Sequence, residues 1–138
     1  MKKSFILLCI TFILSTTKLL ATQYAVVASP SLEDIPLAKI KALFLKKTFY
    51  VKDTKVVVLN LPPKNPIRSS FEKKVLHMSF NKLKSYWTKQ HYLGHRPPIV
   101  LKSQESIKAF IKKVHGAIGY IELSQVDDDL KILYKWSD

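Results

Sequence analysis

Residues 56–87, VVVLNLPPKNPIRSSFEKKVLHMSFNKLKSYW, decide the expected fold of this 138-residue chain. They open with an apolar run from Val56 to Leu59, which predicts a buried strand. A proline-rich turn follows, and Asn65 and Pro66 then mark a helix start as its N-cap and its first helical residue. A strand that leads into a helix start leaves backbone N–H groups free at the positive end of the helix dipole. We therefore expect any anion site of this protein to lie at this turn.

The first turn of that helix carries Arg68, Ser69 and Ser70, which together with Asn65 are the candidate ligand-binding residues. The planar guanidinium of Arg68 suits bidentate pairing with phosphate, sulfate or a carboxylate. The alternative is an ordinary salt bridge from Arg68 to Glu72, four residues along the helix. The two serine hydroxyls add donors, although serine is also common at helix starts, and that interpretation is favoured for Ser70.

The rest of the chain alternates between predicted strands and helices. This order predicts a three-layer αβα sandwich with a mostly parallel mixed sheet, and the length fits one domain. Strands are expected at 23–28, 55–59, 99–101, 117–121 and 130–136, and helices at 36 to about 47, at 66–77, from 79 to a loop at 90–98, and at 105–115.

Residues 1–21 have the pattern of a secretory signal peptide: two lysines, an apolar run at 5–14, and Ala21 as the expected cleavage position. The alternative is an uncleaved anchor, although the apolar run is short for a bilayer. Cys9 is the only cysteine, so the mature domain, 22–138, would contain no disulfide. We expect a secreted, periplasmic protein that is not transmembrane after cleavage.

The chain is strongly basic, with 23 Lys and Arg against 10 Asp and Glu and a net charge of +13. Loss of Lys2, Lys3 and Lys18 with the signal peptide would leave +10. In an exported protein this favours anionic lipid, a polyanionic surface sugar or a small anion over nucleic acid. The lysines are spread along the chain, so solvated helix faces explain most of them.

Other polar clusters predict neither a metal, nor a cofactor, nor an enzyme. His91 and His95 have a metal-like spacing, but they fall in a predicted loop without a third ligand. The acidic run 127–129 lacks the spaced ligands of a calcium loop. No nucleophile elbow, glycine-rich phosphate loop or pair of catalytic carboxylates is present in the sequence.

Several of these segments resemble a known family, the exported substrate-binding proteins of phosphate ABC transporters, within the type 2 periplasmic binding protein class. NPIRSSFEKKVLHMS is similar to the family's Ser-Pro-Ile-Arg, Phe and Val-Leu-Gly-Met-Ser pattern, and LKSYW and GAIGYI also match. The resemblance covers nearly all of residues 24–135. The chain departs from the family at Lys46, where Gly is usual, and at His115, where Asn or Pro is common before Gly116. Asn65 stands where the family has Ser, and Pro66 replaces the Gly of the Ser-Gly-Thr pattern of full-length members.

The resemblance implies a PBP-like domain that recognises a small oxyanion, phosphate first, for an ABC transporter or a sensor. The chain is long enough for about one lobe of such a protein, and one lobe leaves a ligand half exposed. A transporter permease, a sensor or a second lobe-like chain would then supply the other wall. The alternative function is a non-transport envelope interaction protein whose basic surface binds membrane, a polyanion or a protein partner.

Overall fold

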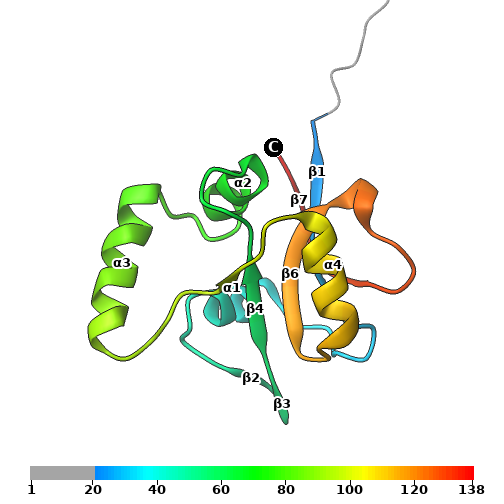
Figure 1. Cartoon of the computed structure of the whole chain (residues 1–138), viewed down its shortest axis with the longest axis horizontal. Coiled ribbons are helices and arrows are strands. Elements are labelled where there is room, and N and C mark those ends of the chain that lie inside the picture. The colour runs from blue at the N-terminus through cyan, green and yellow to red at the C-terminus, as the bar shows by residue number, and fades with distance from the viewer. Residues whose placement is uncertain (1–20) are drawn as a thin grey trace, which may run out of the picture.

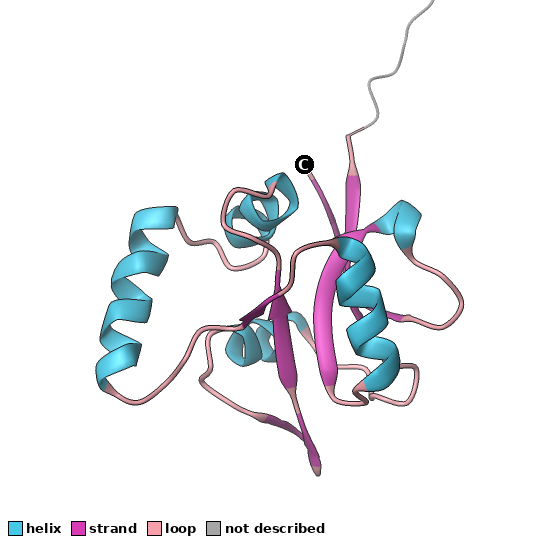
Figure 2. Ribbon diagram, in the orientation of Figure 1, coloured by secondary structure: helices cyan, strands magenta, loops and turns pink. Residues whose placement is uncertain are grey.

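The computed structural model describes residues 21–138, so the predicted signal peptide lies outside the described residues apart from Ala21. Figures 1 and 2 show a main sheet with helices around it. The strands are β1 (Gln23–Ala28), β2 (Tyr50–Val51), β3 (Thr54–Lys55), β4 (Val57–Asn60), β5 (Ile99–Val100), β6 (Ala117–Glu122) and β7 (Lys131–Ser137). The helices are α1 (Leu37–Phe44), α2 (Pro66–Lys74), α3 (Phe80–Tyr92), α4 (Gln104–Lys113) and a short 3₁₀ turn, Leu123–Gln125.

The main sheet has the strand order β5-β4-β6-β1-β7. β4 pairs in parallel with both β5 and β6, whereas β1 pairs antiparallel with β6 and with β7. Only β1 therefore runs against the other four strands. This confirms the predicted mostly parallel mixed sheet.

Two adjacent residues of β6 show why helices cover both faces of the sheet. Successive side chains of a strand point to opposite faces. On one face, Gly119 lies under α4, and a Cβ placed there would be 2.6 Å from Cγ2 of Ile107. On the other face, the Tyr120 ring stacks on Phe71 of α2 at a centroid distance of 4.2 Å and lies 6.2 Å from the Phe44 ring of α1. The predicted three layers are confirmed by this arrangement.

Helix ends differ from the sequence expectations where residues other than glycine adopt left-handed backbone. α1 ends at Phe44 because Lys46 has φ +59°, and α2 ends at Lys74 rather than at His77, which has φ +54°. α3 continues to Tyr92, into the segment predicted as a loop. The β2–β3 hairpin was not predicted from the sequence, because two-residue strands carry almost no periodicity.

Helix α3 stands at the side of the sheet and contacts the core along one side (Figure 1). Leu83 is its buried residue, and Tyr86 is half-buried. The Tyr86 hydroxyl donates a hydrogen bond to the carbonyl of Leu45, at 2.5 Å, which links α3 to the end of α1. Most of the α3 surface is therefore left to solvent. Among residues 21–138, no helix is long and apolar enough to cross a bilayer.

Candidate anion site at the start of α2

The turn between β4 and α2 is anchored to the sheet by a buried hydroxyl. Tyr120 donates a hydrogen bond to the side chain of Asn60 and accepts one, at 3.1 Å, from the backbone N–H of Leu61. Burial raises the pKa of the Tyr120 phenol, so this group stays protonated and neutral. The last residue of β4 and the first residue of the turn are thereby fixed to the neighbouring strand.

Asn65 caps α2 as the sequence predicted, and Pro66 is the first helical residue. The Oδ1 atom of Asn65 accepts a hydrogen bond from the N–H of Ile67 at 2.9 Å, and its carbonyl accepts one from Ser69 at 3.2 Å. Helix geometry leaves the N–H groups of the first turn without intrahelical acceptors. The Asn65 side chain accepts the hydrogen bond of the Ile67 N–H, and Pro66 has no N–H. The N–H of Arg68 is therefore the first-turn donor that remains available to a ligand before the helix.

The guanidinium of Arg68 is already engaged within the protein. Its Nη1 donates to the carbonyl of Leu61 at 2.9 Å, and its Nε lies 3.3 Å from Oε2 of Glu72. The side chains of Arg68 and Glu72 are only 18% and 16% exposed. The structure thus contains the Arg68–Glu72 salt bridge that the sequence offered as the alternative. A ligand would have to use the remaining N–H groups of Arg68 or displace Glu72.

The two serines lie on different faces of α2. The Ser70 hydroxyl is buried, donates to Asp138 at 2.5 Å and accepts from the indole N–H of Trp136 at 3.0 Å. Asp138 also receives a hydrogen bond from Tyr24 at 2.7 Å, and these two hydroxyls hold the pKa of its carboxyl below the usual value. Ser70 therefore ties α2 to the sheet, whereas Ser69 points outward and is exposed.

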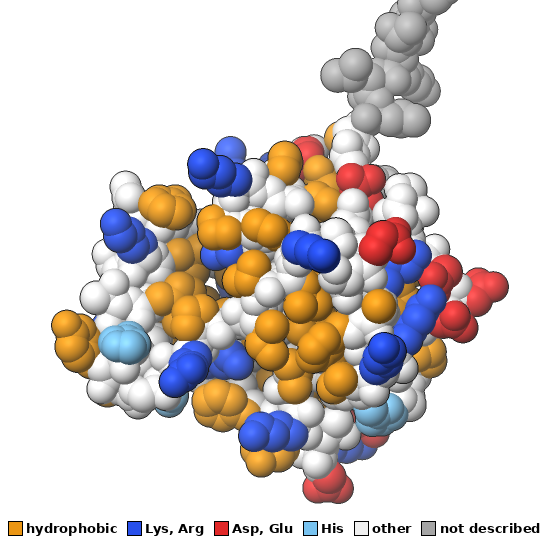
Figure 3. Space-filling model, viewed as in Figure 1, with side chains coloured by type: hydrophobic (Ala, Val, Ile, Leu, Met, Phe, Trp, Pro, Cys, Tyr) orange, Lys and Arg blue, Asp and Glu red, His pale blue; other side chains and the backbone are white. Residues whose placement is uncertain are grey.

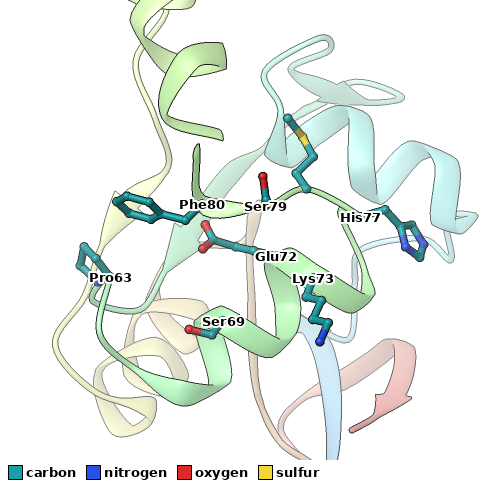
Figure 4. A pocket seen from close by; sticks show the side chains of 8 residues that line it. Pro63, Ser69, Glu72, Lys73, His77, Ser79 and Phe80 are labelled. Atoms are coloured by element: carbon teal, nitrogen blue, oxygen red, sulfur yellow. The ribbon is translucent and has the colours of Figure 1, made fainter. Parts of the chain in front are cut away.

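Ser69 forms part of the wall of a shallow pocket of about 520 Å³ between α2 and the start of α3 (Figure 4). Lys73 follows Ser69 by one helical turn, and Ser79 and Phe80 lie across from them. The pocket offers an ammonium group, an imidazole and two hydroxyls, but it also contains one carboxylate. Its full lining is Pro63, Ser69, Glu72, Lys73, His77, Met78, Ser79 and Phe80. The i, i+4 spacing of Ser69 and Lys73 could have indicated this neighbour from the sequence.

Two other polar residues considered in the sequence, His95 and Asp127, make contacts within the protein. Nδ1 of His95 lies 2.8 Å from the side-chain oxygen of Gln90. Asp127 pairs with Lys108 and Lys112 at 3.1 and 3.2 Å, and these ammonium groups lower the pKa of its carboxyl. Within the part of the chain that the structure describes, no group of three His, Cys, Asp or Glu residues is arranged to hold a metal ion.

The fold is similar to solved phosphate-transport proteins. A protein from Clostridium perfringens, assigned as a phosphate ABC transporter substrate-binding protein and solved with bound phosphate, matches with a TM-score of 0.64 and 20% identity over 82% of this chain and 45% of its own. An ABC-type phosphate transport receptor from Vibrio cholerae matches with a TM-score of 0.64 and 15% identity, over 82% and 46% of the two chains. PstS from Borrelia burgdorferi matches with a TM-score of 0.60 and 17% identity, over 82% and 47%.

These matches show that the chain has the fold expected from the sequence resemblance. The chain spans just under half the length of each of these structures. No protein-family model matches the sequence, and no curated protein matches it.

Proposed function

We propose that this protein is an exported solute-binding protein of the periplasm that recognises a small oxyanion, phosphate first, at the start of α2. The observation that carries the proposal is the pairing of an exposed helix N-terminus with Arg68, on a fold shared with a phosphate-bound structure. The backbone N–H and guanidinium of Arg68 and the hydroxyl of Ser69 are the proposed ligand contacts. Asn65 shapes the helix start, and Ser70 holds α2 in place from the inner side.

The role we propose is binding and not catalysis. The groups around the start of α2 are hydrogen-bond donors with one carboxylate, and that carboxylate is paired with Arg68. Such a set can hold an anion, but it supplies neither an activated nucleophile nor a general base aimed at a substrate. The matched structures are named as substrate-binding proteins and a transport receptor, which supports the same choice.

The proposed site would enclose its ligand on one side only. An anion at the start of α2 would keep one side open to water, and water screens its interactions with Arg68. We propose that a second chain supplies the missing wall, either a second copy of this protein or the permease or sensor that it serves.

Calorimetric titration of the secreted form with phosphate, sulfate and acetate tests the proposal. Phosphate is expected to bind, and Arg68→Gln is expected to weaken it about tenfold or more, since a hydrogen bond to a charged group contributes about 1.5–3 kcal/mol. Arg96→Gln is the matched control, because it removes the same charge from an exposed residue of the α3–β5 loop. Absence of phosphate binding, or equal effects of the two substitutions, would overturn the proposal.

A further inference from the structure

The segment from 73 to 104, which contains all of α3, has no acidic residue. It carries seven Lys and Arg residues and three histidines in 32 positions. All ten Asp and Glu residues of the chain therefore lie outside this segment; they are Glu33, Asp34, Asp53, Glu72, Glu105, Glu122, Asp127, Asp128, Asp129 and Asp138. The positive charge at α3 is therefore not balanced locally, unlike that of Lys108 and Lys112 on α4, which pair with Asp127.

The outward side of α3 gathers hydrogen-bond donors into one surface, which we call the α3 face. Its residues are Lys84, Ser85, Thr88, Lys89 and Tyr92, and together they line a shallow depression of about 480 Å³. They lie on the side of the helix opposite Leu83, the residue that α3 buries. The two ammonium groups, the Ser85 hydroxyl and a phenol match the oxygen acceptors of a phosphate ester, and no carboxylate lies among them. The Thr88 hydroxyl already donates to the carbonyl of Lys84 at 2.8 Å.

The C-terminal end of the α3 face is apolar and projects from the molecule. Tyr92 is 85% exposed, and Leu93, which follows the helix, is 61% exposed. The fold buries little of either side chain, so neither contributes much apolar burial to the stability of the protein. Arg96 lies three residues further along the chain and is also exposed. An exposed tyrosine and leucine between basic residues is the composition that favours the boundary between lipid headgroups and acyl chains.

Figure 3 shows the resulting separation of charge. In this view the acidic side chains gather toward the right, the top and the bottom of the molecule. The left side, which α3 occupies in Figure 1, displays basic, histidine and apolar side chains. A second, equally basic copy of this chain would be repelled by such a surface, whereas an anionic surface would be attracted.

We propose that the α3 face docks the protein on a bilayer that contains anionic phospholipid. Lys84 and Lys89 contact the lipid phosphates, while Tyr92 lies at the headgroup level and Leu93 reaches the acyl boundary. The geometry favours a bilayer over a folded protein, because the surface is a projecting helix with shallow depressions and offers no deep groove to a partner. The contact is peripheral and reversible, since two apolar side chains cannot give permanent anchoring.

This membrane contact does not depend on the proposed anion site. Tyr92 ends α3, twelve residues after Phe80, so it lies about 18 Å along the helix axis from the α2–α3 turn. Docking through the α3 face therefore leaves the start of α2 open to a soluble ligand. The protein would be held near the membrane while Arg68 stays accessible.

Vesicle co-sedimentation of the secreted form tests the inference. The probes are phosphatidylcholine vesicles with and without phosphatidylglycerol, at low and high salt. Binding is expected only with phosphatidylglycerol and is expected to fall in high salt. Replacing Lys84 and Lys89 by Gln should weaken it about 25-fold, given about 1 kcal/mol for each basic residue near an anionic surface. Leu93→Ser should weaken it about tenfold through lost apolar burial.

A double variant with Gln at Lys113 and Lys135 is the matched control, because it removes two charges from α4 and β7 instead. Binding close to wild type in this control, with loss in the Lys84 and Lys89 variant, supports the inference. Equal losses in both variants would mean that overall charge alone drives binding, and would overturn it. Failure to bind anionic vesicles, or equal binding to pure phosphatidylcholine, would also overturn it. All five substituted residues are on the surface, and a thermal melt of each variant verifies its folding.

Discussion

The guanidinium Nε of Arg68 lies 3.3 Å from the carboxylate of Glu72, one helical turn along α2. Both side chains are mostly buried, so water screens this pair less than it would on an open surface. The residue with the best chemistry for binding an anion thus already has an anionic partner. Glu72 therefore competes with the proposed ligand for Arg68. Replacing Glu72 should change the stability of α2 and the affinity of the site in opposite directions.

Glu72→Gln is expected to tighten phosphate binding about fivefold while lowering the free energy of unfolding by up to about 1 kcal/mol. The substitution removes a negative charge next to the ligand and frees the Nε donor of Arg68. It also removes the only carboxylate from the pocket that Ser69 and Lys73 line. Calorimetric titration gives the affinity, and a denaturant curve gives the stability.

Glu33→Gln serves as the control for that experiment, since Glu33 pairs with Lys52 at an exposed position away from α2. It should leave phosphate affinity unchanged. Weaker phosphate binding by Glu72→Gln would show that Glu72 orients Arg68 for the ligand, contrary to the competition argued from the geometry.

Replacement of Lys46 or His77 by glycine is expected to stabilise the protein by about 0.5–1 kcal/mol each. Both residues have left-handed backbone, with φ of +59° and +54°, which costs about 1–2 kcal/mol for a residue with a Cβ and very little for glycine. Part of the gain is lost because glycine makes the unfolded chain more flexible. Thermal melts of the two single variants measure the effect.

Gly94→Ala is the converse substitution. Gly94 has φ +81°, and a Cβ there would meet no atom within 4 Å, so backbone strain alone should lower the melting temperature. If all three substitutions shift the melting temperature in the same direction, backbone conformation does not control these helix ends.

Lys46 and His77 also show how far the sequence could predict the fold. The resemblance placed glycine at both positions, and the structure keeps the glycine-type conformation with other residues. The backbone N–H groups of Lys46 and Lys47 close α1 on the carbonyls of Leu43 and Ala42 at 3.1 and 2.9 Å, which is the Schellman arrangement. The order of helices and strands along the chain and the helix N-caps were therefore predictable. The helix ends were not, because the residues that close them are not glycine.

The candidate site was predictable in position but not in the contacts that its side chains make. Asn65 caps α2 as its sequence context indicates. Ser70, however, lies on the buried side with Ile67 and Phe71, a grouping that helical spacing alone places on one face. Its partner Trp136 is 66 residues away in sequence, and no local pattern reveals that contact. The position of Ser69 and Ser70 in the first turn of α2 therefore did not show which of the two hydroxyls is exposed.

Gly119→Ala is expected to destabilise the protein by about 1–3 kcal/mol, because it adds a methyl group to a filled core. The new Cβ would lie 2.6 Å from Cγ2 of Ile107 on α4, and both residues are buried. Ile107→Leu moves the branch of that side chain away from the helix backbone at nearly constant volume. Gly119→Ala should cost less in the Ile107→Leu background, as a double-mutant cycle by denaturant unfolding would show. If the free-energy changes of the two substitutions are additive, the cost of Gly119→Ala does not come from a clash with Ile107.

The carboxyl of Asp138 should make stability depend on pH in the acid range. Hydrogen bonds from Ser70 and Tyr24 lower its pKa in the folded protein below the ordinary value of 3.8. The unfolded chain therefore takes up a proton first as the pH falls, so the stabilisation is present above the unfolded pKa and is lost as the pH drops through the lower folded value. Wild type should melt above Asp138→Asn at neutral pH, and the difference should shrink as the pH falls below the ordinary pKa of 3.8.

A calorimetric melting series across this pH range measures that difference, with Asp53→Asn, in the exposed β2–β3 turn, as the control for loss of one carboxylate. Ser70→Ala should reduce the same acid-range slope, because Asp138 then keeps only the hydrogen bond from Tyr24. Ser70→Ala should also lower stability at every pH, since the indole N–H of Trp136 loses its acceptor. If Asp138→Asn and wild type show the same dependence of melting temperature on pH in the acid range, the Asp138 carboxylate does not hold the end of β7 against α2. The inner side of α2 would then be held only by the hydrogen bond from Trp136 to Ser70.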